Sequence, residues 1–261
     1  MNKCPISCVI CAYKESSFLE DCVKSLLAQT VRPVIQIITS TPNAFISAVA
    51  DKYHIPVLVN QGEGSMKNNW NFAYETAQTP YVTICHQDDI YEKNYIEELL
   101  KHIQKDTRNE IILLHTRWKM IKDGKQQESR CSVVHALLNN IAKFFPASQW
   151  MRLRLLSFGN AIKTPSICYN KSRCGFPLFD SAYQFALDWD TFVRLAKKPG
   201  KFIYVDRLAF LYRVSGESES CVYTKNQQRS REDLAMFRSL WPKPIAWIIS
   251  KIYKLAYSVY E

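Results

Sequence analysis

The sequence predicts an α/β fold in which a Rossmann-like, mostly parallel sheet is flanked by helices and followed by a C-terminal helical appendage. Between residues 5 and 115, short apolar runs alternate with segments of helical periodicity, which is typical of parallel strands connected by helices. The chain has 261 residues, of which 47% are hydrophobic and 13% aromatic, so it can bury a substantial core. It contains no internal repeat and no low-complexity tract.

The first half of the chain carries the clearest strand and helix patterns. Apolar runs bounded by turn residues predict strands at residues 6–12, 34–39, 56–59, 81–85 and 111–115. Helices are expected between these runs, and their inward apolar side chains include Leu19, Val23, Val49, Trp70 and Leu99. The sequence Ser17-Phe18-Leu19-Glu20 matches a capping box and predicts that the first helix begins there.

The second half is less regular. Asp123-Gly124 predicts a tight turn, and residues 131–157 form a helical, mixed basic and apolar insert that either faces a membrane or covers the site. Further elements are expected as a loop and strand at 159–169, a helix at 188–196, and short strands at 201–205 and 208–212. We expect residues 1–220 to form one domain and residues 221–261 to form a helical tail.

The charge of the chain restricts its partners. A formal charge of +10 and a pI near 9.1 suit a nucleic-acid binder, a protein on anionic lipid, or an enzyme that captures phosphorylated substrates. The sequence has no RNA-binding signature, zinc-finger spacing or long block of Lys and Arg, so a nucleic-acid partner is not expected.

Nine scattered cysteines, an odd number, indicate a reducing compartment. Cys8 and Cys11 have CxxC spacing, but they fall inside an expected strand without a second pair, which favours buried thiols over a zinc site. The first residues run directly into that strand without the apolar core of a secretion signal. We therefore expect a cytoplasmic protein.

An acidic pair follows the strand at 81–85. In His86-Gln87-Asp88-Asp89 two adjacent carboxylates lie at the predicted rim of the sheet, and both should be ionised because an unperturbed Asp has a pKa of about 3.9. Two like charges side by side are costly unless a cation compensates them, and carboxylate oxygens suit Mg²⁺ or Mn²⁺. Taken alone, the pair is equally consistent with a solvated turn or a helix cap.

The acidic pair should share its surroundings with two other loops. In open parallel sheets the ligand lies beyond the carboxyl ends of the strands, so the loops that begin at Ala12, Thr39 and His86 are expected to converge. The absence of a G-x-G-x-x-G or Walker A element disfavours a Rossmann dehydrogenase and a P-loop ATPase. A nucleotide site built on carboxylates and a metal remains.

These residues resemble family-2 glycosyltransferases, which are inverting enzymes with a GT-A fold and nucleotide-sugar donors, and the resemblance extends from Ile6 to about Ser220. It implies a nucleotide-sugar-binding half at 1–120 and an acceptor-side half at 121–220. In the first half it implies that Asp88 lies toward the ribose and Asp89 binds the divalent metal. The other implied donor-binding residues are Ala12, Tyr13, Glu15, Thr39 and Asn71.

The second half carries two further motifs of the family. Residues 186–195 look like the Glu-Asp-x-Asp-x-x-x-Arg-Leu acceptor motif, which implies Asp188 as the catalytic base, with Asp190 as a fallback for the base or for fixing Arg194. The alternative is that these aspartates only favour the helix N-terminus. Residues 211–218 are similar to the family's Tyr-Arg-x-His-x-x-Ser tail and contain Arg213 and Ser215.

Several positions depart from the family pattern. His86 replaces the first Asp of the metal motif, where it is either a structural hydrogen-bonding group or a ligand. Thr39 and Ser40 replace acidic residues that read the base, which leaves the base open. The remaining replacements are Trp70 for Arg, Leu187 for Glu and Ser215 for His. Positive charge for the phosphates could come from Arg213 or Lys67.

The resemblance implies an inverting transferase of the hexosyltransferase type, in a bacterial setting of surface polysaccharide biosynthesis. It would move a sugar from a nucleotide-diphosphate donor, most commonly a UDP-sugar in this family, to a hydroxyl of a glycan or lipid-linked glycan. Asp188 would receive the hydroxyl proton, and a metal on Asp89 would stabilise the departing diphosphate. The alternative is a non-catalytic protein that binds nucleotide sugars or glycans. A nucleotidyltransferase is disfavoured because its Gly-rich, Arg-containing first loop is absent.

The tail offers two interpretations. From Trp241 onward, Ile245, Ile248, Ile249 and Ile252 share one helical face, while Lys residues interrupt the run too often for a spanning helix. Residues 241–261 therefore either lie in the interface of a membrane or dock on the protein's own core. Membrane contact would make an acceptor carried on a polyprenyl lipid at the cytoplasmic face natural.

Overall fold

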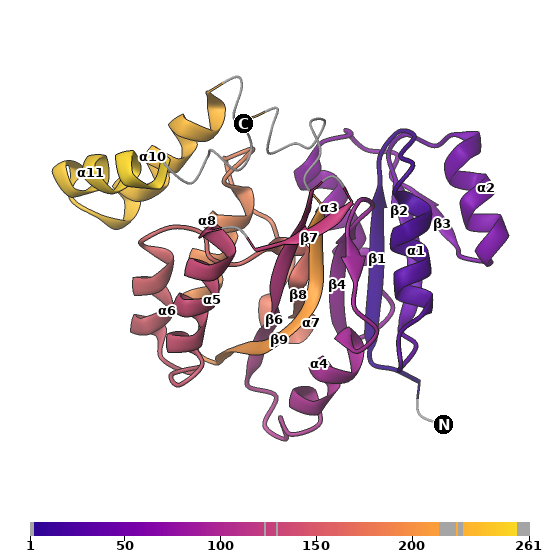
Figure 1. Cartoon of the computed structure of the whole chain (residues 1–261), viewed down its shortest axis with the longest axis horizontal. Helices are drawn as coiled ribbons and strands as arrows, with labels where there is room; N and C mark the ends of the chain where they lie inside the picture. Colours follow the sequence, from indigo (N-terminus) through magenta and orange to yellow (C-terminus); the bar gives the residue numbers. More distant parts are fainter. Residues whose placement is uncertain (1–2, 123, 129, 214–222, 224–226, 255–261) are drawn as a thin grey trace.

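The computed structural model describes residues 3–122, 124–128, 130–213, 223 and 227–254 (Figure 1). Within these residues one nine-stranded mixed sheet has the order β3-β2-β1-β4-β8-β6-β9-β5, with β7 paired to β6. The strands are β1 Ile6–Ala12, β2 Val34–Thr39, β3 Val57–Val59, β4 Tyr81–His86, β5 Ile90–Tyr91, β6 Ile111–Lys122, β7 Lys125–Gln127, β8 Ile167–Asn170 and β9 Lys201–Arg213.

The strands from β3 to β4 run parallel, and so do β6 and β9, whereas β8 is antiparallel to both β4 and β6. The predicted α/β fold, with parallel strands and flanking helices, is confirmed. The parallel strands β1, β2 and β4 bring the ends of the first, second and fourth predicted strands to one edge of the sheet.

The helices cover both faces of the sheet. They are α1 Leu19–Leu27, α2 Ala44–Tyr53, α3 Met66–Thr76, α4 Tyr95–Ile103, α5 Arg130–Ala142, α6 Gln149–Leu156, α7 Lys171–Cys174, α8 Leu187–Ala196, α10 Gln228–Leu240 and α11 Lys243–Lys254, with a 3-10 turn η1 at Thr164–Ser166. The apolar side chains of α1, α2 and α4 pack on one face, and those of α3, α8 and α10 pack on the other. Both faces of β1 are buried, since Ile10 belongs to the first core and Val9 to the second. This explains the continuous apolar run of that strand.

Two local predictions are wrong. The capping box is absent, because Phe18 rather than Ser17 occupies the N-cap of α1, and its side chain caps nothing. Glu20 instead accepts hydrogen bonds from Lys52 and Tyr53 of α2, at 2.8 and 2.6 Å. The two short strands at 201–205 and 208–212 are one strand, β9, whose pairing with β6 shifts register between Val205 and Leu208. Such an irregularity interrupts the sequence pattern without ending the strand.

The two tail helices dock on the core. The rings of Phe237 in α10 and Trp189 in α8 lie 4.9 Å apart, and Tyr253 of α11 lies 5.4 Å from Phe237. The docked face of α11 contains the buried Ala246 and Ser250, with Ile249 and Tyr253 beside them, so only Ile249 of the expected isoleucine face packs on the core. The expected domain boundary at residues 220 and 221 lies outside the described residues and stays a prediction.

Candidate active site

A cavity of about 810 Å³ opens where β1 and β4 end, which is the edge of the sheet at which the sequence predicted a site. Its other walls come from the start of α3, the loop before α8, and the helices α10 and α11. Five residues predicted for the site line this cavity, and these are Ala12, Tyr13, His86, Asp88 and Asp188. The two halves of the predicted site therefore face one hollow.

Tyr13 stands at the end of β1 with a largely exposed ring. Its main chain is clamped by Gln87, which accepts a hydrogen bond from the Tyr13 N–H at 3.0 Å and donates one to the Tyr13 carbonyl at 2.9 Å. The next residue, Lys14, has a positive φ of 54°, and its N–H donates to the Thr41 hydroxyl. The loops after β1, β2 and β4 are thus joined by side-chain to main-chain hydrogen bonds, and the Tyr13 ring remains available to stack on a flat ligand.

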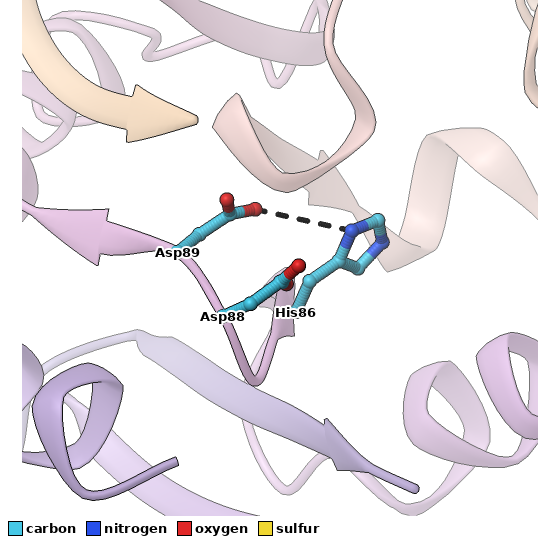
Figure 2. Close-up of side chains that lie close together, drawn as sticks. All are labelled: His86, Asp88 and Asp89. Atoms are coloured by element: carbon cyan, nitrogen blue, oxygen red, sulfur yellow. Dashed lines mark ion pairs between the residues drawn. The ribbon is translucent and has the colours of Figure 1, made fainter. Parts of the chain in front are cut away.

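His86, Asp88 and Asp89 form a cluster whose candidate ligand atoms all lie within 4.8 Å of one another (Figure 2). Asp89 is fully buried, and its Oδ2 atom, 3.9 Å from His86 Nδ1, has no hydrogen-bond partner in the described part of the chain. A buried carboxylate oxygen without a partner is costly, and a divalent cation would satisfy it. One imidazole and two carboxylates therefore fit a divalent metal.

Burial raises the pKa of the Asp89 carboxyl well above its usual range, and the neighbouring charge of Asp88 raises it further. The pKa of Asp88 is also raised by burial. The pKa of His86 is lowered to about 4 by burial and by the positive charge of Lys163, so this imidazole is neutral near pH 7. A neutral imidazole has a free lone pair, which is the form that binds a metal.

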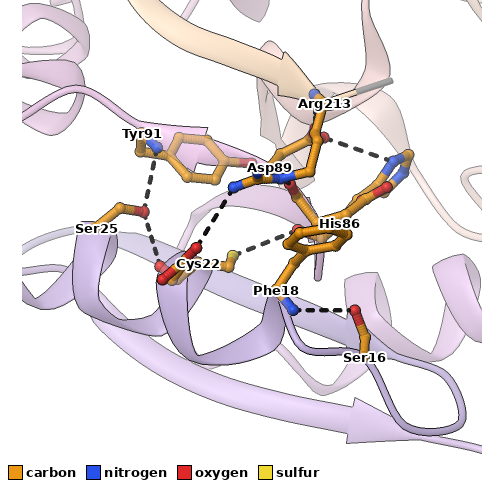
Figure 3. A network of polar contacts seen from close by, with 10 residues as sticks. Ser16, Phe18, Cys22, Ser25, His86, Asp89, Tyr91 and Arg213 are labelled. Atoms are coloured by element: carbon orange, nitrogen blue, oxygen red, sulfur yellow. Dashed lines mark hydrogen bonds and ion pairs between the residues drawn. The ribbon is translucent and has the colours of Figure 1, made fainter. Parts of the chain in front are cut away.

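Three elements hold the cluster in place (Figure 3). The main-chain N–H of Arg213, at the end of β9, donates to Asp89 Oδ1 at 2.9 Å, and Arg213 Nε donates to the Asp88 carbonyl. The guanidinium lies over the ring of Phe18, 4.2 Å from its centroid. From α1, the Cys22 thiol donates to the His86 carbonyl, and Ser25 accepts from the N–H of Tyr91 in β5. Arg213 thus shapes the acidic turn and does not line the cavity.

Two departures from the family pattern contact each other. The ring of Trp70 stacks on the ring of His86, with centroids 5.3 Å apart and planes 20° from parallel. Trp70 also packs against Phe179 at 5.0 Å, in the loop that leads to α8. The stack fixes the plane of the imidazole, and its Nδ1 atom lies 3.9 Å from Asp89 Oδ2.

Asp188 lies in the first turn of α8, but its carboxylate does not cap the helix. Its Oδ2 accepts hydrogen bonds from Asn160 and Thr164, both at 3.0 Å, and its Oδ1 accepts from the Trp189 N–H at 2.7 Å. Burial raises the pKa of Asp188, while these donors and the charge of Lys163 oppose the rise. A carboxylate that is held from two sides and faces a cavity is suited to accept a proton.

The loop that leads to Asp188 and α8 is held by hydrogen bonds from two sides. Glu232 of α10 accepts three main-chain hydrogen bonds, from Gln184, Phe185 and Ala186, at 3.2, 2.7 and 2.9 Å. On the other side, Asn71 of α3 exchanges two hydrogen bonds with the main chain of Phe179. A carboxylate at the start of a helix also complements the helix dipole. The tail helix α10 therefore positions the side of the cavity that carries Asp188.

The other predicted site residues lie outside the cavity lining. Thr39 is buried and bonds to Thr41, Asn71 bonds to Phe179, and Glu15 is exposed. Asp190 projects from α8 without lining the cavity, and Ser215 falls outside the described residues. Their expected roles stay predictions.

Sequence reasoning missed a cluster between α6 and η1. Asn160, Lys163 and Thr164 all line the cavity, and the charge of Lys163 acts on both Asp89 and Asp188. The Lys163 ammonium also lies 4.4 Å from the ring centroid of Tyr212. These residues lie in a segment without periodicity, and the available signal was a lysine followed by a threonine, three residues after an asparagine.

Comparison with known proteins identifies the family. Residues 7–154 match the family described as Glycosyl transferase family 2. Glycosyltransferase GlyG of Streptococcus pneumoniae serotype 4 is 28% identical over 115 residues, covering 41% of this chain and 38% of GlyG. The chain therefore spans less than half the length of this relative.

Solved structures share the fold. S. aureus TarS has a TM-score of 0.63 at 12% identity, covering 88% of this chain and 38% of TarS. TarS 1-349 in complex with UDP-GlcNAc has a TM-score of 0.62 at 14% identity, covering 82% and 59% of the two chains. The mannosyltransferase PcManGT from Pyrobaculum calidifontis, in complex with GDP-Man and Mn²⁺, has a TM-score of 0.66 at 10% identity, covering 99% and 76%. Because the family match covers more than half of the chain and these structures share its architecture, the protein belongs to glycosyl transferase family 2 and has a GT-A-type fold.

Proposed function

We propose that this protein is an inverting, hexosyltransferase-type enzyme that moves a sugar from a nucleotide-diphosphate donor to a hydroxyl of a glycan or lipid-linked glycan. The observation that carries the proposal is that His86 and Asp88, which form a cluster with the buried Asp89, line the same cavity as Asp188. TarS and PcManGT were solved with UDP-GlcNAc and with GDP-Man, which supports a nucleotide-sugar donor. A UDP-sugar is the donor to test first.

The donor side of the cavity would hold the nucleotide. The Tyr13 ring would stack on the base, and the Asp88 carboxylate would accept a hydrogen bond from the ribose. Asp89 would hold a divalent ion, Mn²⁺ or Mg²⁺, with Asp88 and His86 as its neighbours in the cluster. When bound, such an ion supplies positive charge that stabilises the departing diphosphate.

On the acceptor side, Asp188 would act as the general base. Asn160 and Thr164 donate to Oδ2, whereas Oδ1 accepts a hydrogen bond from the Trp189 N–H and retains a lone pair for the incoming proton. The burial that raises the pKa of Asp188 increases its affinity for that proton. Proton acceptance by a positioned carboxylate contributes about 10²–10⁴-fold in rate.

Lys163 would supply a fixed positive charge for the diphosphate. It lines the cavity, and its charge acts on the carboxylates of both sides. Of the two cations expected from the sequence, Arg213 does not line the cavity, whereas Lys67 does and donates to the Ser181 carbonyl at 3.0 Å. This contact directs Lys67 toward the loop before α8.

We also propose a cytoplasmic enzyme of bacterial surface polysaccharide biosynthesis that takes a polyprenyl-linked acceptor, with membrane contact through residues 241–261. The free cysteines among the described residues, which include Cys8, Cys11 and Cys85, support a reducing compartment. Within the described residues, the helices are too short or too polar to cross a bilayer.

The decisive experiment follows nucleoside diphosphate release from UDP-, dTDP- and GDP-sugars with Mn²⁺, with Mg²⁺, and after chelation by EDTA. We expect slow hydrolysis of one donor that stops in EDTA and returns when metal is restored. Binding of a donor, measured by thermal shift, without release under any metal condition would contradict the transferase and favour a non-catalytic nucleotide-sugar-binding protein.

A further inference from the structure

The exposed apolar side chains of this protein are concentrated in two stretches of the chain. Of the fifteen large hydrophobic residues that are exposed in the described part, twelve fall between residues 133 and 158 or between 245 and 252. They are Val133, Val134, Leu137, Ile141, Phe144, Phe145, Trp150, Phe158, Ile245, Trp247, Ile248 and Ile252. A soluble monomer rarely exposes so many apolar groups together, and such patches mark interaction sites.

The helices that carry these residues have inverted polarity. In α5 the buried side chains are Ser132, His135 and Asn139, while Leu137 is 62% exposed. In α11 the buried side chains are Ala246 and Ser250, while Ile252 is 63% exposed. A helix on the surface of a globular protein ordinarily places its apolar face inward. These helices are instead patterned for an apolar environment on their outer side.

The exposed side of α6 contacts Trp241, which lies in the turn between α10 and α11. The Arg154 guanidinium lies 5.6 Å from the ring centroid of Trp150 and 4.9 Å from that of Trp241. The Trp241 ring in turn lies 5.4 Å from the ring of Phe158. Figure 1 shows α5, α6, α10 and α11 together at the end of the molecule opposite to α2. We name the outer side of α5, α6 and α11, with the connecting Phe144, Phe158 and Trp241, the apolar–basic surface.

The charges on this surface are mostly positive. The sequence contains no Asp or Glu from Arg130 to Phe179, or from Leu234 to Tyr260. Asp206 of β9 forms an ion pair with Lys143 at 3.1 Å. Three of the exposed aromatic residues have a cation beside them, with Lys143 over Phe144, Arg154 over Trp150 and Lys251 over Trp247. Aromatic and aliphatic side chains next to Lys and Arg are typical of helices that lie in the headgroup region of an anionic bilayer.

We propose that the apolar–basic surface binds an anionic lipid bilayer. A second copy of this chain fits less well, because a two-fold interface would bring together two surfaces that are both positively charged. The surface includes α5 and α6 and so extends well beyond the tail. The inner sides of the same helices reach the cavity, through His135 of α5 and Tyr253 of α11. On a bilayer, the cavity would therefore lie next to the lipid headgroups, which, if the proposed transfer is correct, is where a lipid-linked acceptor presents its hydroxyl.

The test is flotation of the full chain with phosphatidylcholine vesicles, with and without about 30% phosphatidylglycerol. We expect the protein to float with the anionic vesicles and to float at least about tenfold less with the neutral ones or at high salt, because part of the binding is electrostatic. The test variants are Leu137→Glu in α5 with Phe144→Glu just after this helix, and Trp247→Glu with Ile248→Glu in α11. Matched controls are Leu58→Glu and Phe176→Glu, which are exposed apolar residues elsewhere.

The variant pairs should each reduce flotation about tenfold, while the controls float like the wild type, and all should keep the wild-type circular dichroism and Tm. A wild-type chain that stays with the unbound protein, or variants that float normally, would overturn the proposal. Sedimentation of a wild-type dimer that the α5 or α11 variants dissociate would assign the surface to a second copy instead. Vesicle binding does not depend on donor chemistry, so failure of the proposed transferase would leave this result unaffected.

Discussion

The two walls of the cavity are held by different means. On the wall that contains Tyr13 and Asp88, called the donor wall after its proposed role, the loops follow neighbouring parallel strands. Main-chain pairing there aligns Ala12 with Thr39 and Cys11 with His86. On the opposite wall, called the acceptor wall, Asp188 is held by Asn160 and, through the preceding loop, by Glu232, which come from remote parts of the chain. The geometry of the first wall follows from the strand register, whereas the geometry of the second depends on individual polar contacts.

The walls also differ in how far their polar atoms are satisfied. The donor wall contains Asp89 Oδ2, which lacks a hydrogen-bond partner among the described residues. The acceptor wall presents a carboxylate with donors on both oxygens. A buried carboxylate oxygen without a hydrogen-bond partner is stabilised by a bound cation, whereas a carboxylate with fixed hydrogen bonds is held in one orientation toward a substrate. This difference supports the proposed roles, which are cation binding for the first wall and proton transfer for the second.

The largest effect should come from the acceptor wall. Asp188→Asn removes the proton acceptor but keeps the size of the side chain, so we expect turnover to fall about 10²–10⁴-fold while nucleotide affinity stays unchanged. Steady-state kinetics and calorimetric titration with the nucleoside diphosphate measure the two quantities. The control is Asp190→Asn in the same helix, outside the cavity lining. If Asp190→Asn shows the loss and Asp188→Asn does not, the base has been assigned to the wrong residue.

A smaller effect is expected for Lys163, whose charge acts on carboxylates of both walls. Lys163→Met removes the ammonium but keeps an apolar stem, so affinity for the nucleoside diphosphate should fall about 10- to 100-fold, as for a lost charged contact. Affinity for the corresponding nucleoside, which has no phosphate, should not change. Lys67→Met is the matched comparison, because Lys67 also lines the cavity but its ammonium donates to the main chain of Ser181. Equal losses for nucleoside and diphosphate would mean that Lys163 shapes the cavity rather than binding phosphate.

The smallest effect concerns the support of the acceptor wall. Glu232→Ala leaves three main-chain N–H groups without their carboxylate, which should cost about 1–3 kcal/mol of folding free energy and lower the Tm by several degrees. Turnover should fall with it, while diphosphate affinity persists because the donor wall has its own anchors. Glu232→Gln retains one acceptor oxygen and should recover part of the stability. A parallel loss of diphosphate affinity would show that the two walls are not independent.

This contrast explains how much could be predicted from the sequence. The strands predicted at 6–12 and 34–39 coincide with β1 and β2, because buried parallel strands appear as unbroken apolar runs and end at turn residues. The residues at their ends, such as Ala12 and Tyr13, could therefore be placed at the site. Topology alone brings them there.

The acceptor wall and the outer helices carry less of this information. Lys163 and Glu232 act through contacts between segments far apart in sequence, which no local pattern encodes. The capping box failed because the chain entered α1 one residue later than expected. In α11 the sequence predicted that a stripe of isoleucines would face a membrane or the core. The residues that are buried against the core are instead Ala246 and Ser250, whose small side chains allow the helix to approach closely.

The stack of Trp70 on His86 has a consequence for the ion that the proposed metal site would select. Where three carboxylates would surround a cation with three negative charges, the cluster here offers two carboxylates and one imidazole nitrogen. Magnesium prefers oxygen and surrenders its hydration shell reluctantly, whereas transition metals accept imidazole readily. The imidazole that Trp70 holds in place would thus shift the preference of the proposed site from magnesium toward manganese and other transition metals.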